Sequence, residues 1–90
     1  MLPKNRAPTM PGVILDVEFR EPMGMTQAQL AERMGVSVQT VNLLIGGKRS
    51  VTADTALSLA KVFRTTPEFW MNLQNAVDLW NAKKRQVREA

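Results

Sequence analysis

The sequence predicts a small all-α domain of five helices, the last of them long. Three observations support this. Residues 26–45 contain two short helical patterns joined by a glycine turn, and residues 56–63 place apolar side chains at helical spacing. A Thr-Pro pair at 66–67 then opens a final helical run to about Gln86. Ninety residues with 44% hydrophobic content form one domain with one modest core.

The N-terminal part should contain an arm and a first helix. Residues 1–8 hold two prolines and little to bury, so we expect a flexible arm that either contacts a partner or has no role. Pro11 suits the first position of a helix, which Pro22 and Gly24 should end. Its apolar residues form two stripes: Val13, Ile14 and Val17, then Leu15 and Phe19. Two stripes predict burial on more than one side, either against a partner or wholly within the domain.

Residues 26–45 predict a helix-turn-helix. Thr26 and Gln29 have the spacing of a capping box at the start of the first helix. Gly35 stands where the chain leaving that helix needs a positive φ, and Ser37 can cap the second helix at once. The resulting turn is short, as in helix-turn-helix units that place their second helix in the major groove of DNA.

The second of these helices should turn polar side chains outward. Gln39, Thr40, Asn42 and Leu43 fall on the side away from its apolar residues, and Gln39 is the strongest candidate for pairing with adenine. Val38 could face either a thymine methyl group or the core. Leu43 could contact a thymine methyl group, cover a partner surface, or simply be tolerated in solvent.

Residues on either side complete the predicted DNA surface. Gln27 begins its helix, where it could dock on a phosphate or brace a base-reading side chain. Ser37 should act first as a cap. Lys48 and Arg49 follow the glycine pair that ends the second helix and should contact phosphates. The candidate DNA-binding residues are Gln27, Ser37, Val38, Gln39, Thr40, Asn42, Leu43, Lys48 and Arg49.

The last two helices should provide structure and assembly. Thr52 can cap a helix whose buried face is Ala56, Leu59, Ala60 and Phe63. The final helix is apolar over an unusually wide arc, which favours a second chain packed against it, although it could also wrap on its own domain. The residues predicted at this dimer interface are Phe69, Trp70, Leu73, Val77 and Trp80.

Composition restricts the possible functions. The chain has no cysteine or histidine, and its carboxylates are scattered, so we expect no metal site, no cofactor and no catalytic activity. No apolar run approaches the roughly 20 residues of a membrane span, and no secretory signal precedes the domain, which favours the cytoplasm. The net charge is +4, and the excess lies in residues 26–66, as expected for a polyanionic partner.

Several motifs resemble a known family. The pattern of Gln27, Ala31, Gly35, Val36-Ser37, Val41 and Leu44 resembles the helix-turn-helix of phage repressor/Cro (XRE) proteins. The runs GKRSVTADTALSLAKVF and TPEFWMNLQNAVDLW resemble the HigA/VapI antitoxins, and the resemblance covers roughly residues 9–82. It implies a homodimer that represses its own operon through a palindromic operator and neutralises a HigB-like endoribonuclease toxin. It also places DNA-reading residues at Gln39, Thr40 and Asn42, with Gln27 beside them.

The expected organisation has three parts: an arm at residues 1–8, a DNA-binding domain at 9–66 with its helix-turn-helix at 26–45, and a dimerising helix at 67–90. Three functions compete on the sequence. They are an autoregulating antitoxin, an XRE-class repressor without a toxin, and a helical interaction module with an incidental basic surface. The residues themselves favour DNA binding, whereas the toxin enters only through the resemblance.

Overall fold

The computed structural model describes residues 6–89 and confirms the all-α prediction. The helices in chain order are α1 (Pro11–Ile14), the π-helix η1 (Leu15–Arg20), α2 (Gln27–Met34), α3 (Val38–Ile45), α4 (Ala53–Phe63) and α5 (Pro67–Glu89). Most of the arm predicted at residues 1–8 lies outside the described residues. None of the helices in the described part is long and apolar enough to cross a membrane.

The first helix differs from its prediction. The chain is helical from Pro11 to Arg20 as expected, but only its first turn is α-helical, and the rest is a π-helix. The two apolar stripes also separate in the structure. Leu15 is 1% exposed, whereas Val13 and Val17 are 45% and 48% exposed, so only one stripe and its neighbours enter the core.

The helix caps form as the sequence predicted. Thr26 Oγ1 accepts the N–H of Gln29 at 3.0 Å, while the Gln29 side chain accepts the N–H of Thr26 at 2.9 Å. Gly35 has φ 73°, and Ser37 Oγ accepts the N–H of Thr40 at 3.1 Å to start α3. These bonds satisfy main-chain donors that a helix start otherwise leaves open. They fix the angle between α2 and α3.

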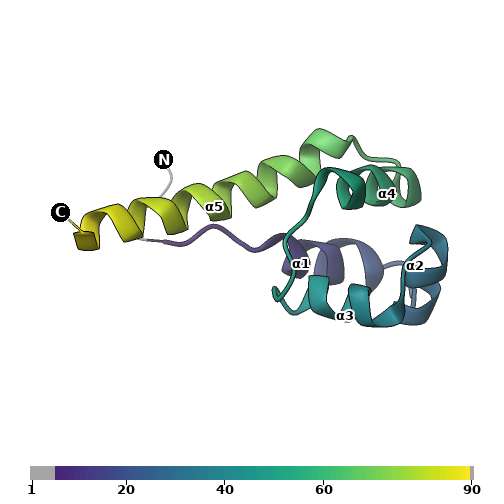
Figure 1. Cartoon of the computed structure of the whole chain (residues 1–90). Helices are drawn as coiled ribbons and strands as arrows, with labels where there is room; N and C mark the ends of the chain where they lie inside the picture. Colours follow the sequence, from purple (N-terminus) through teal and green to yellow (C-terminus); the bar gives the residue numbers. More distant parts are fainter. Residues whose placement is uncertain (1–5, 90) are drawn as a thin grey trace.

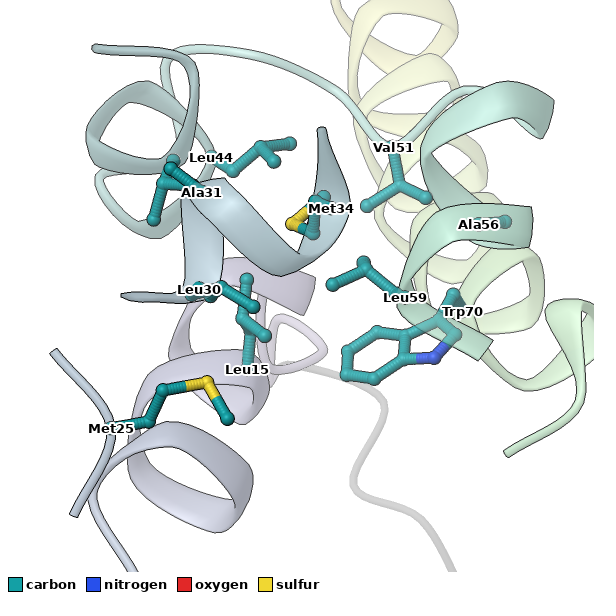
Figure 2. Packing of buried hydrophobic residues seen from close by; sticks show 11 residues of the cluster. Leu15, Met25, Leu30, Ala31, Met34, Leu44, Val51, Ala56, Leu59 and Trp70 are labelled. Atoms are coloured by element: carbon teal, nitrogen blue, oxygen red, sulfur yellow. The ribbon is translucent and has the colours of Figure 1, made fainter. Parts of the chain in front are cut away.

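One core holds the helices together (Figure 2). Leu15 of η1 packs near Leu30 of α2, and Leu59 of α4 lies between Val51 and Trp70. Trp70 is 0% exposed, and its ring lies 5.1 Å from that of Phe19. Each large apolar side chain buried in this way contributes roughly 1.5–3 kcal/mol to folding. The core therefore joins the helix-turn-helix to the start of α5.

The first helix and α3 approach closely at Gly12. A Cβ atom at this position would collide with the carbonyl oxygens of Leu44 and Ile45, the second of them at 2.7 Å. A glycine allows the two backbones to meet at this distance. Figure 1 accordingly shows the first helix between α3 and α5.

Helix α5 is longer than expected and ends at Glu89 rather than near Gln86. Its first half packs on α4, and its C-terminal half projects beyond the other helices (Figure 1). Thr66 Oγ1 accepts the N–H of Phe69 at 3.1 Å, which confirms the predicted cap at this end. The projecting half leaves Leu79 59% exposed and Val87 77% exposed.

Candidate nucleic-acid interface

The start of α3 exposes the side chains that the sequence singled out for base contacts. Val38 is 48% exposed, and Gln39 and Asn42 are exposed beside it. Val38 therefore faces solvent, which removes the alternative that placed it in the core. No hydrogen bond within residues 6–89 engages the Gln39 amide, so both its oxygen and its nitrogen are free for an adenine edge.

Gln27 and Asn42 meet across the two helices of the motif. Asn42 Nδ2 donates to Gln27 Oε1 at 3.5 Å, a long hydrogen bond between residues 15 apart in the chain. This contact leaves Asn42 Oδ1 as an acceptor and Gln27 Nε2 as a donor without a hydrogen bond among the described residues. The bracing role predicted for Gln27 therefore has a geometric basis.

The Thr40 hydroxyl belongs to a chain of polar contacts. It lies 2.9 Å from Ser37 Oγ and 3.5 Å from Nη1 of Arg49, which is close enough for a weak donation by the guanidinium. Thr40 is only half-exposed, unlike Gln39 beside it. Its hydroxyl is thus directed at the cap and at Arg49, and this arrangement connects the start of α3 with the loop after it.

Leu43 corrects the prediction of a fully outward side chain. It is half-buried, so it does not stand free in solvent beside Asn42. Its carbonyl accepts the N–H of Lys48 at 2.9 Å and the N–H of Arg49 at 3.2 Å. The backbone of Leu43 thereby fixes the loop after α3.

That loop presents two cations. Lys48 and Arg49 are both exposed, and the turn that leads to them uses Gly47 at φ 74°. The loop is anchored on Leu43, and Arg49 reaches back to Thr40 of α3. Exposed amides with cations in the adjoining loop suit a DNA duplex, in which phosphates lie beside the base edges. Among the described residues, no three Cys, His, Asp or Glu side chains gather as metal ligands would.

The residues predicted at a dimer interface divide into two groups. Trp70 and Val77 are 0% and 9% exposed, so the fold of the single chain already buries them and leaves little of either side chain for a partner. Phe69 is 37% exposed, and Leu73 and Trp80 are half-buried, which leaves them available on α5. Leu79, which the prediction left out, is more exposed than any of these.

Sequence reasoning also missed Gln74. This amide is 7% exposed and lies on the same side of α5 as Trp70 and Val77. Its Oε1 accepts the N–H of Val51 at 2.8 Å, and its Nε2 donates to Asp78 Oδ1 at 2.9 Å. The i, i+4 spacing from Trp70 was the only indication in the sequence.

Comparison with known proteins identifies relatives over nearly the whole chain. A family model described as helix-turn-helix matches residues 18–70, which include α2, the turn, α3 and the basic loop. Over 86 residues the chain is 50% identical to antitoxin HigA-1 of Vibrio cholerae, covering 96% of this chain and 81% of HigA-1. It is also 47% identical over 79 residues to YbaQ of Escherichia coli K12, an uncharacterized helix-turn-helix-type transcriptional regulator, covering 88% of this chain and 70% of YbaQ.

Solved structures of a similar protein share the fold. Antitoxin GraA matches with a TM-score of 0.89 at 44% identity, over 94% of this chain and 91% of GraA. GraA in complex with its operator matches with a TM-score of 0.85 at 43% identity, over 99% of this chain and 90% of GraA.

Proposed function

Because this chain belongs to the helix-turn-helix family, in the group that contains the HigA antitoxins, we propose that it is a DNA-binding antitoxin that represses its own operon. Its proposed partners are operator DNA, a second copy of the chain and a HigB-like endoribonuclease toxin. It acts by binding rather than catalysis, in the cytoplasm, where the operator is.

The proposal rests mainly on the amide side chains of Gln39 and Asn42 near the start of α3. The Gln39 amide makes no hydrogen bond within residues 6–89, and Asn42 is exposed and donates a long hydrogen bond to Gln27. Lys48 and Arg49 supply positive charge beside them. The similarity to GraA, whose structure with its operator covers 99% of this chain, supports the same use of the surface here.

The proposed mechanism depends on symmetry. A dimer presents two α3 helices about 34 Å apart, one turn of B-DNA, so the operator should be palindromic. The exposed apolar side chains of α5 provide the contact between copies, with Phe69, Leu79 and Trp80 as its centre. Occupation of the promoter excludes polymerase, and toxin binding changes operator affinity through thermodynamic linkage.

A mobility-shift titration tests the DNA-binding part. The probes are the chain's own promoter and a scrambled duplex of the same length, each titrated at several salt concentrations. We expect tighter binding to the promoter, by about 10³-fold or more at physiological salt. Equal affinity for both duplexes would reject a sequence-specific repressor.

A second candidate is a repressor that has no toxin, favoured by the 47% identity to the transcriptional regulator YbaQ. Co-expression separates the two functions. The protein encoded by the adjacent reading frame should stop growth when expressed alone and permit growth when this chain is present. If that protein is harmless, or if this chain does not restore growth, the repressor without a toxin replaces the antitoxin.

A further inference from the structure

The outer side of the first helix exposes apolar residues flanked by acids. Val13 and Val17 are 45% and 48% exposed, while Leu15 between them points into the core. Glu18 and Glu21 are exposed next to the valines. We call Val13, Val17, Glu18 and Glu21 the acidic-apolar face.

Most of this face lies on the π-helical part of the first helix. The N–H of Glu21 bonds to the carbonyl of Asp16 at 2.9 Å, five residues back, as a π-helix requires. Val17 and Glu21 are four residues apart, which is close to one helical turn, so they lie on the same side of the first helix. Short π segments occur frequently at functional sites, so this departure from α geometry supports a role for the face.

The charge of this face is opposite to that of the chain. Residues 16–21 contain three of the eight acidic groups but only one of the twelve basic groups, in a chain of net charge +4. That one basic group, Arg20, already donates to Asp16 Oδ1 at 2.6 Å and to the carbonyl of Met25 at 2.9 Å. Glu18 and Glu21 therefore keep their negative charge available to a partner.

The acidic-apolar face lies on a different element from the candidate DNA-binding residues, which belong to α2, α3 and the turn and loop that flank α3. The first helix meets α3 at Gly12, which abuts the carbonyls of Leu44 and Ile45 at the carboxyl end of α3. DNA is an unsuitable occupant because its phosphates would be repelled by Glu18 and Glu21.

We propose that the acidic-apolar face is the docking surface for the toxin. This inference rests on the proposed antitoxin function. An enzyme that cleaves RNA must carry a cationic surface for its phosphate-rich substrate, which complements the exposed carboxylates of Glu18 and Glu21, neither of which has an ion pair within residues 6–89. Val13 and Val17 supply apolar area at the centre, while Glu18 and Glu21 form a charged rim. Docking there covers basic surface of the toxin and leaves the DNA surface open.

Calorimetric titration with the protein of the adjacent reading frame tests this proposal. The test variants of the full chain are Glu18→Lys/Glu21→Lys, which reverses the rim charge, and Val13→Ser/Val17→Ser, which removes the apolar centre. The control is Glu32→Lys/Asp54→Lys, which changes the net charge equally at exposed residues of α2 and α4. All four substituted residues of the charge variants are exposed, so folding should be retained, as circular dichroism will verify.

We expect each test variant to lose about tenfold or more in toxin affinity, while the control retains the unsubstituted chain's affinity. The charge-reversed variant should also bind with less dependence on salt. Promoter affinity of the charge-reversed variant should match that of the control. This set of results supports the docking surface.

Three other results would overturn it. If the unsubstituted chain binds the toxin and all variants bind equally well, the docking surface is wrong although the antitoxin function stands. If the test variants alter the sedimentation coefficient of the free chain, the face joins copies of this chain instead. If the unsubstituted chain binds the promoter but not the adjacent protein, the antitoxin function fails, and this inference fails with it.

Discussion

The Oε1 atom of Gln74 accepts the main-chain N–H of Val51 at 2.8 Å, within the protein interior. The bond joins α5 to the segment that follows the basic loop of Lys48 and Arg49. The position of this basic loop is thereby tied to the helix proposed to hold two copies together. A buried N–H that lost this acceptor would lose the one hydrogen bond that it makes within residues 6–89, at the cost of its desolvation.

Gln74→Leu should therefore lower the free energy of unfolding by about 1–3 kcal/mol, since leucine offers no acceptor to Val51. Urea denaturation followed by circular dichroism measures the change. Asn72→Leu on the exposed side of α5 is the control and should change stability by less than about 0.5 kcal/mol. Equal stability of the two variants would show that the bond to Val51 contributes nothing.

Gly12→Ala should destabilise the chain by about 1–3 kcal/mol, because the added methyl group collides with backbone oxygens of α3 rather than with a flexible side chain. The matched substitution is Gly46→Ala, where φ is −77° and the nearest atom to a new Cβ is 3.3 Å away. The thermal midpoint should fall clearly more for Gly12→Ala. A similar fall for both would contradict the close approach of the first helix to α3.

Gln39→Ala should reduce discrimination at one operator base pair by about 1–3 kcal/mol, because it removes the only side chain of α3 whose amide is wholly free. Competition between the operator and single-base variants measures this loss. Gln86→Ala, an exposed amide on α5, is the control. If Gln39→Ala weakens operator and scrambled DNA to the same extent, Gln39 does not read a base.

Lys48→Ala should weaken binding to every sequence. Each lost phosphate contact lowers the slope of log affinity against log salt by about 0.9, so a dimer that loses two should change by about 1.8. Arg49→Ala should act in the same way and in addition release the Thr40 hydroxyl. Lys61→Ala on α4 removes the same charge from outside the predicted surface. An unchanged slope for Lys48→Ala would place Lys48 away from the phosphates.

Trp80→Glu should shift the chain from dimer to monomer in sedimentation velocity. The reason is that burying a carboxylate at an apolar contact, with no opposite charge beside it, costs more free energy than the contact supplies. Trp80 is half-buried on α5, whereas the control Asn75→Glu places the same charge on an exposed polar position. A Trp80→Glu chain that remains dimeric would move the contact elsewhere on the molecule.

The local structure of this chain was more predictable than its packing. Thr26, Ser37 and Gly35 have effects that depend on neighbours within four residues, so their caps and turn were predicted correctly. The exposure of Gln39 and Asn42 followed from the apolar positions of the same helix. Their roles in reading bases remain predictions.

The orientation of α5 was less predictable, because its apolar residues occur on nearly every side. Periodicity placed Trp70 and Trp80 in the same wide apolar arc without showing which of them faces the core. The structure buries Trp70 and Val77 together with Gln74, an amide that sequence reasoning would place outside. Its partner Val51 is 23 residues away, and no local pattern encodes such a bond. The π-helix after Ile14 likewise has no local sequence signature that we identified.

The burial of Trp70 has a spectroscopic consequence. Its ring is sealed in the interior, and its Nε1 donates to Thr65 Oγ1 at 2.7 Å, so its fluorescence should be blue-shifted and resistant to iodide quenching until the chain unfolds. Trp80 is half-open to solvent on α5, so its emission should respond to whatever covers that helix. With only two tryptophans in the chain, one optical measurement can follow unfolding and association as separate events.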